Sequence, residues 1–233
     1  MPANGMSTTR RNLRGLLLRS GAELAVIVLG VLIALWADGW AAERADREIE
    51  RNRVEALRDN VTATRLRLDE ARQEARAARG ALIAIASWQE PARLGERSDL
   101  VLDGMLFGPT FTPEINVYDD LKSSGDLALL TNADLRQALA RMDAIFERLA
   151  LLQDDLTTVQ QLNFDPFVIR ELALGGILGP NLGLRDLPLD TPAPAFDLRV
   201  LRNLALFKLD LVSLLIARYD EATEALDAVE AAM

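Results

Sequence analysis

The first strong pattern along the chain is an apolar run between residues 16 and 40. No charged residue occurs from Leu24 to Ala37. As a helix that rises about 1.5 Å per residue, the wider stretch from Gly21 to Trp40 covers roughly 30 Å, which matches the hydrocarbon core of a bilayer. Residues 16–40 are therefore predicted to form a transmembrane helix that follows a basic tail at residues 1–15, with the lipid bilayer as its first partner.

Both ends of this predicted span carry residues that prefer a membrane interface. Arg19 can extend its charge to the near interface, and Trp36 and Trp40 lie one helical turn apart at the far one. The first 20 residues hold four arginines and no acid, whereas acids outnumber arginines between residues 38 and 50. The positive-inside rule then places the N-terminus in the cytoplasm and the domain at residues 41–233 in the periplasm.

Two export signals are alternatives to a permanent anchor. A basic start followed by an apolar run also fits a cleaved signal peptide. However, this run is longer than the usual core of about 7 to 15 residues and contains Glu23, and Ala37-Asp38-Gly39 is a poor cleavage site. The stretch TRRNLR also resembles a twin-arginine signal, although arginine pairs are common in basic tails.

One face of the predicted span is suited to contact with another helix. Gly30 and Ala34 form a small-xxx-small pair, which allows two helices to approach closely. Glu23 is costly inside a membrane, and either it pairs with Arg19 at the interface or it marks a functional face. The predicted association face, for a protein partner or for self-association, consists of Glu23, Ile27, Gly30, Ala34 and Ala37.

Beyond the span, apolar residues recur at alternating intervals of three and four, which is typical of helices that pack along a seam. Three such seams occur: Val54, Leu57, Val61, Thr64, Leu68, Ala71, Ala75, Ala78, Leu82 and Ile85; Leu135, Ala138, Met142, Ile145, Leu149, Leu152, Leu156 and Val159; Leu198, Leu201, Ala205, Val212, Leu215, Tyr219, Leu226 and Val229. No alternating run indicates a strand. The predicted fold is therefore all-α, with the N-terminal transmembrane helix continuing into an antiparallel helical bundle.

Capping residues indicate where the helices begin and end. Thr112 before Pro113 predicts one helix start, Thr131-Asn132 another, and Asp197 a third. Gly125 is a suitable C-cap. Asp165-Pro166 interrupts the second seam, and residues 175–194 hold four glycines and four prolines, which predicts a surface loop.

Composition narrows the possible functions. The formal net charge is −9, and an acidic domain repels phosphate backbones, so nucleic acid is not an expected partner. The chain has no cysteine and no histidine. It therefore lacks the commonest general base, thiolate nucleophiles and the commonest transition-metal ligands, which argues against an enzyme and leads us to expect no metal and no cofactor.

The few reactive side chains favour structural roles. Lys122 and Ser123 are adjacent and point about 100° apart on a helix, so they do not face each other as a catalytic dyad would. We expect Ser123 and Ser124 to bond the last helical turn instead. The acid pairs at 119–120 and 154–155 lack the spacing of a calcium loop. Lys208 lies on the third seam, where a buried lysine needs a partner from another helix, so we expect either a structural ion pair or a side chain that extends to water.

A motif in the middle of the chain carries a family resemblance. The matching residues are Gly21, Glu23 and Trp40 in the span, and Tyr118, Leu121, Lys122, Ser123, Ser124, Gly125 and Leu127 downstream. In these the chain resembles an uncharacterised bacterial family of single-pass membrane proteins, which pairs a GE-initiated apolar span with a Y-x-x-L-K-S-S-G-x-L motif. Ala22 and Gly39 depart from the family pattern. The resemblance implies a location in the bacterial inner membrane and a structural role for the motif, but no activity.

These observations together predict a non-enzymatic, membrane-anchored helical module that binds another protein. The alternative is an extracytoplasmic helical sensor domain that binds a small ligand and signals through a partner protein.

Overall fold

The computed structural model describes residues 9–89, 100, 102–106, 108–171, 174, 183 and 197–233, with side chains from residue 28 onward except that of Leu102. Every regular element in this part of the chain is helical, so the all-α prediction is confirmed. The chain divides into two compact units, residues 1–53 and 54–233.

The first unit consists of the N-terminal part of helix α1, which spans Thr9–Ala86. Within the described residues, no helix has a stretch that is both long enough and apolar enough to cross a membrane. Residues 16–27 of the predicted span, which include Arg19, Glu23 and Ile27, lie outside the described side chains. Gly30, Ala34 and Ala37 lie on α1 and are exposed, as are Trp36 and Trp40.

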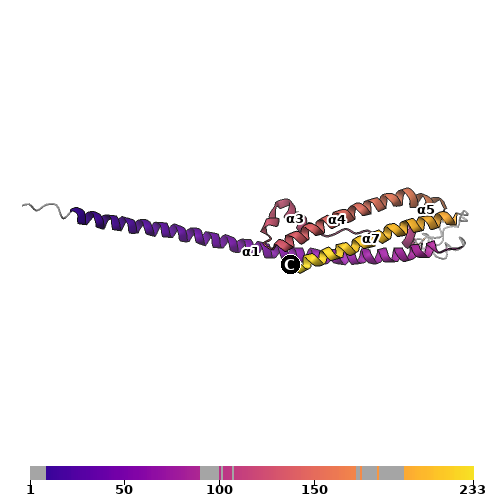
Figure 1. Cartoon of the computed structure of the whole chain (residues 1–233), viewed down its shortest axis with the longest axis horizontal. Coiled ribbons are helices and arrows are strands. Elements are labelled where there is room, and N and C mark those ends of the chain that lie inside the picture. The colour runs from indigo at the N-terminus through magenta and orange to yellow at the C-terminus, as the bar shows by residue number, and fades with distance from the viewer. Residues whose placement is uncertain are drawn as a thin grey trace, which may run out of the picture. The chain divides into compact units, whose positions relative to one another are not determined.

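The second unit is built on three long helices that share one hydrophobic core: the part of α1 from Val54 onward, α4 (Ala133–Val159) and α7 (Leu198–Ala232) (Figure 1). The predicted seam of α1 is buried except for Val54, which is partly buried. On α4 the apolar stripe is wider than predicted, because Leu139 and Phe146 are also buried. A stripe of this width suits a helix that packs against neighbours on two sides.

Short elements complete this unit. They are the π-helical segment η3 (Leu102–Leu106), α3 (Asn116–Ser124), the 3-10 turn η4 (Asp126–Leu129), the π-helical segment η5 (Gln160–Phe164) and α5 (Asp165–Glu171). The predicted interruption at Asp165-Pro166 is thus a wider helical turn directly before Asp165. Proline has no N–H for a regular helical hydrogen bond, and the helix continues as α5 beyond it.

The directions of the long helices differ from the expected antiparallel arrangement in one respect. Helix α7 runs antiparallel to α1, because Arg202 near its start donates to the carbonyl of Ala86 and Asp227 near its end binds Arg65. It also runs antiparallel to α4, since Asn132 donates to the carbonyl of Ala232. Helices α1 and α4, however, run in the same direction.

An extended return segment explains this parallel pair. Gly104 packs against Ile85 of α1, and ten residues later Glu114 bonds Thr64 of the same helix. Positions 64 and 85 are 21 residues apart, about 31 Å along a helix, and because residues up to Leu106 belong to η3, much of that distance falls to residues 108–114, which form no regular element. The chain therefore returns to the start of the core as an extended strap, and α4 then begins beside the same part of α1.

Helix ends follow the predicted caps, with one exception. Asn132 accepts from the N–H groups of Asp134 and Leu135, and Asp197 accepts from that of Arg199, so both N-caps are confirmed. Gly125 takes the left-handed conformation with φ 82°, as the C-cap prediction requires. The predicted N-cap at Thr112 is wrong.

Helix α3 is capped from outside instead. It begins at Asn116, and Asn60 of α1 accepts the N–H of Val117. Thr64 of α1 both accepts from the N–H of Glu114 and donates to its carbonyl. Because α1 supplies these partners, a local cap at Thr112 is not needed.

Candidate functional site

The candidate site lies where α4 passes into η5, between α7 and the segment that holds η3. Lys208 of α7 is only 6% exposed, which is unusual for a lysine. Its ammonium Nζ donates to the carbonyl of Met105 at 3.1 Å and to Oε1 of Gln160 at 2.8 Å. The prediction that a buried Lys208 would take its partners from other elements is confirmed.

Gln160 holds this arrangement together. Its amide nitrogen donates to the Met105 carbonyl at 3.0 Å and to Oδ1 of Asp165 at 2.7 Å, while its oxygen accepts from Lys208. One side chain thus joins η5, η3 and α7. The charge of Asp165 also acts on Lys208 and raises its pKa.

Both segments that supply these groups are π-helical. Met105 belongs to η3 and Gln160 opens η5. π-Helical turns cost stability relative to α-helix and occur frequently at functional sites. Gly104 allows η3 to approach α1 this closely, because a Cβ there would lie 3.2 Å from Ile85 Cδ1 and 3.3 Å from Ala81 Cβ.

The electrostatic environment of Lys208 favours its neutral form. Burial lowers its pKa from 10.5 to about 8, and the charge of Asp165 opposes part of this effect. The ammonium also lies 5.3 Å from the centroid of Phe164, whose ring stacks on Phe207. A cation over an aromatic face is stabilised by the ring quadrupole, so Phe164 favours the protonated form.

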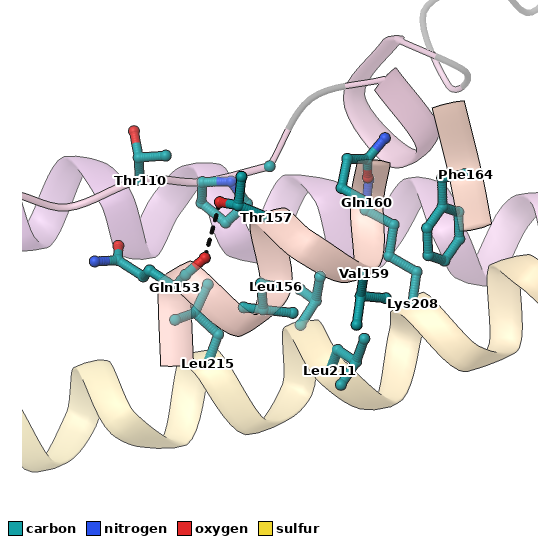
Figure 2. A pocket seen from close by; sticks show the side chains of 13 residues that line it. Thr110, Gln153, Leu156, Thr157, Val159, Gln160, Phe164, Lys208, Leu211 and Leu215 are labelled. Atoms are coloured by element: carbon teal, nitrogen blue, oxygen red, sulfur yellow. Dashed lines mark hydrogen bonds between the residues drawn. The ribbon is translucent and has the colours of Figure 1, made fainter. Parts of the chain in front are cut away.

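A cavity of about 150 Å³ lies beside Lys208 (Figure 2). Lys208, Gln160 and Phe164 form one end of it, while Gln153 and Leu215 form the other. The wall between them is mainly apolar and is supplied by Leu156, Val159, Leu211 and Val212. The hydroxyl of Thr157 lies at the edge and donates to the carbonyl of Gln153 at 2.9 Å.

A second glutamine fixes the opposite end of the cavity. Gln153 accepts the N–H of Phe111 at 2.7 Å and donates to its carbonyl at 3.0 Å, so it binds the return segment as a neighbouring strand would. Tyr219 of α7 also donates to Gln153, at 3.3 Å. Burial raises the pKa of Tyr219, and its ring meets Phe111 edge-on.

Sequence reasoning missed Gln153, Gln160 and Met105. The available signal was the spacing of the two glutamines, which lie seven residues apart and therefore on the same face of the helix, among the leucines of the second seam. Met105 takes part through its backbone carbonyl, so its side chain gave no signal. The prediction for this region named Lys208 alone.

The motif at residues 118–127 forms a separate cluster on α3. Lys122 binds Asp143 of α4 at 2.6 Å, and the same carboxylate accepts a long bond of 3.5 Å from the buried Tyr118. The bond to Asp143 raises the pKa of Lys122, and burial raises that of Tyr118. This motif therefore ties α3 to α4.

The serines of the motif close the helix as expected. Ser123 donates to the carbonyl of Asp120, and Ser124 donates to that of Leu121 and accepts the N–H of Asp126. Leu121 is fully buried and Leu127 partly. The acid pairs at 119–120 and 154–155 are exposed, and no group of three or more potential metal ligands occurs in the described parts of the chain.

Comparisons with protein-family models, with curated proteins and with solved structures find no match to this chain. The family resemblance of the motif therefore stays a prediction.

Proposed function

We propose that the chain is a membrane-anchored helical module that binds another protein through residues 16–40, in a bacterial inner membrane, and that it has no enzymatic activity. The anchor is supported by the uncharged sequence from Leu24 to Ala37 and by the interface residues Arg19 and Trp40 at its ends. The N-terminus is then cytoplasmic and the helical domain periplasmic.

The observation that carries this proposal is the exposure of the apolar residues that follow position 27. Every large apolar side chain from there to Trp40 is between 50% and 73% exposed: Val28, Leu29, Val31, Leu32, Ile33, Leu35, Trp36 and Trp40. Soluble proteins rarely leave so large a continuous apolar surface in water. Lipid tails or a second helix would cover it at a gain of about 25 cal/mol per Å².

The face that contains Gly30 is suited to a helix partner. A Cβ at Gly30 would have no neighbouring atom within 4 Å, so nothing in its surroundings hinders the approach of another backbone. Ala34 and Ala37 continue this small-residue face, and Glu23 adds a polar group that a partner helix can satisfy.

A crosslinking pulldown from native membranes tests the association face. The double variant Glu23→Leu, Gly30→Leu is expected to lose the partners that the wild type captures, because leucine at position 30 keeps the helices apart. Ala25→Leu is the matched control, since position 25 lies on the opposite side of an ideal helix, and it is expected to retain them. An unchanged partner list in the double variant would refute the association face.

The anchor and its orientation have their own tests. Carbonate extraction is expected to leave the full chain in the membrane pellet, and release into the supernatant would refute anchoring. In intact spheroplasts, added protease is expected to digest the domain beyond residue 40. Digestion seen only after lysis would overturn the periplasmic orientation.

We also propose a second function, in which the domain senses a small ligand and signals through a partner protein. The observation that favours it is the cavity beside Lys208, where a buried cation and two glutamines meet an apolar wall. Pockets that combine a mainly apolar lining with a few fixed polar groups are typical of ligand sites. A pulldown whose partner list changes when a ligand occupies the cavity would support it, and an unchanged list would count against it.

A further inference from the structure

The cavity beside Lys208 limits the size of any occupant. Its volume is about 150 Å³. An engineered apolar cavity of about that volume, in another protein, binds benzene. A fitting ligand is therefore a molecule of about the size of a single aromatic ring.

The cavity borders solvent on the side of the return segment. Gly108 and Thr110 of that segment and Thr157 of α4 line the cavity, and all three are exposed. A small molecule can therefore enter between the return segment and α4 while the hydrophobic core stays closed.

The wall limits the chemistry of the ligand. Five branched aliphatic side chains line it from two helices: Leu156 and Val159 of α4, and Leu211, Val212 and Leu215 of α7 (Figure 2). An apolar molecule gains free energy by leaving water for such a wall, whereas a polar molecule would lose hydrogen bonds to water there. The wall therefore favours a hydrocarbon.

The polar groups at the Lys208 end of the cavity are bonded within the protein. Lys208 donates to the Met105 carbonyl and to Gln160, and the amide nitrogen of Gln160 donates to the same carbonyl and to Asp165. A polar ligand would have to break one of these bonds in order to form its own. Such an exchange of one hydrogen bond for another gains little free energy.

The polar groups at the opposite end are bonded in the same way. Gln153 binds both backbone groups of Phe111 and accepts from Tyr219, and Thr157 donates to the backbone carbonyl of Gln153. These side chains join the elements that enclose the cavity. The affinity of a ligand then depends on its apolar surface.

We propose that this cavity binds a small uncharged hydrocarbon of about the size of a single aromatic ring, enclosed by Leu156, Val159 and Leu211. The inference rests on the second proposed function and specifies its ligand. The volume sets the size of the ligand, the aliphatic wall favours an apolar surface, and the bonded glutamines at both ends make a polar head group unnecessary.

The lysine content of the chain provides a direct probe. Lys122 and Lys208 are its only lysines, so full-length protein labelled with ¹⁵N and ¹³C on lysine gives two sets of side-chain signals. In nonionic detergent micelles, toluene is expected to shift the signals of Lys208, which lines the cavity, because an aromatic ring alters the magnetic field around it. Lys122 binds Asp143 on another part of the domain and is expected to stay unchanged.

Phenol separates apolar from polar recognition. It has the shape of toluene, with a hydroxyl in place of the methyl group. Because both compounds also enter micelles to different extents, they are compared at equal free concentration in water. Phenol is expected to bind at least roughly tenfold more weakly, since its hydroxyl loses bonds to water and has to displace an existing bond to find a partner.

A matched pair of variants locates the binding. Leu156→Trp places a larger side chain in the cavity and is expected to abolish the shift of Lys208 by toluene. Leu151→Trp introduces the same side chain on α4 at a position 67% exposed and is expected to retain it. If Leu156→Trp fails to fold by circular dichroism, the comparison of toluene with phenol on the wild-type chain still tests the ligand class.

The outcomes distinguish this inference from the function on which it rests. Phenol binding as tightly as toluene, or more tightly, would overturn the hydrocarbon inference and leave a ligand-binding domain. Lys208 signals that move with neither compound would overturn both. If toluene binds and Leu156→Trp abolishes its binding, the hydrocarbon site is supported, and a partner list that toluene leaves unchanged would then count against signalling alone.

Discussion

The change Lys208→Met tests how much stability the buried ammonium costs the folded chain. Burial lowers the pKa of Lys208 from 10.5 to about 8. The unfolded chain therefore holds a proton between pH 8 and pH 10.5 that the folded chain has released. Where the unfolded state binds more protons, stability rises with pH. Below pH 8 the wild-type chain is therefore destabilised by the full free-energy cost of burying the charged ammonium. This cost disappears as the pH rises towards 10.5.

The size of the effect follows from the two pKa values. Their difference, 10.5 minus about 8, is about 2.5 pH units, and one pH unit corresponds to about 1.4 kcal/mol, so the full free-energy cost of burying the charged form is about 3 to 4 kcal/mol. Between pH 7 and pH 10 the wild-type chain is expected to recover about 2 to 3 kcal/mol of this cost relative to the methionine variant.

At pH 7 the Lys208→Met variant also loses a hydrogen bond that stabilises the wild-type chain. Gln160 Oε1 loses the hydrogen bond from Lys208, which costs about 1 to 3 kcal/mol, whereas the Met105 carbonyl keeps the bond from the Gln160 amide. The net expectation at pH 7 is a variant that is more stable by about 1 kcal/mol. The change of the stability difference with pH is a better test than its value at pH 7, because the lost hydrogen bond contributes equally at every pH.

Urea unfolding of the wild-type chain and of Lys208→Met at pH 7, 8, 9 and 10 measures how the difference in their stability depends on pH. Tyr219 and Tyr118 have raised pKa values and Lys122 does too, so they add their own pH dependence above pH 9. These groups are present in both proteins, and their contributions cancel in the difference. A stability difference that stays constant from pH 7 to pH 10 would refute the conclusion that burial destabilises the charged form of Lys208.

Three further predictions concern stability, each measured by urea unfolding. Leu139→Ala removes a fully buried side chain and should cost about 2 to 5 kcal/mol, whereas Leu162→Ala, at a position 71% exposed, should change stability by less than about 0.5 kcal/mol; equal costs would contradict the assignment of the core. Asn132→Ala removes the N-cap of α4 and its bond to the Ala232 carbonyl and should cost about 1 to 2 kcal/mol, so a neutral result would show that the cap is not used. Thr64→Val removes both bonds to Glu114 and should cost about 1 to 3 kcal/mol; the exposed Thr62→Val is the control, and a cost no larger than that of the control would mean that Thr64 does not hold the return segment.

The sequence by itself determined the helices and most of their buried faces. An apolar side chain at every third or fourth position lies on one side of any α-helix, whatever surrounds it, so the seams could be predicted without neighbours. The caps at Asn132, Gly125 and Asp197 were equally local, because each uses atoms within three residues of the helix end.

Tertiary structure decided which helices run parallel. The pattern of a helix does not record the direction of its partner, and the extended return segment that leads from η3 to Glu114 has no periodic signal of its own. Helix α3 shows the same limit, since Asn60 and Thr64 of α1 supply its N-terminal partners in place of Thr112. Hydrogen bonds between residues about 50 positions apart cannot be predicted from local propensity.

At the candidate site, too, the sequence predicted some features and the tertiary structure decided the others. The position of Lys208 on an apolar seam marked it as unusual, but the sequence left open whether the side chain is buried with a partner from another helix or extends to water; the structure shows that it is buried. Its partners are a backbone carbonyl of η3 and the amide of Gln160, which meet it only after α4, α7 and the return segment have packed together. Side-chain periodicity fixes which face of a helix is buried, but the atoms that meet across that face depend on the packing of elements distant in sequence.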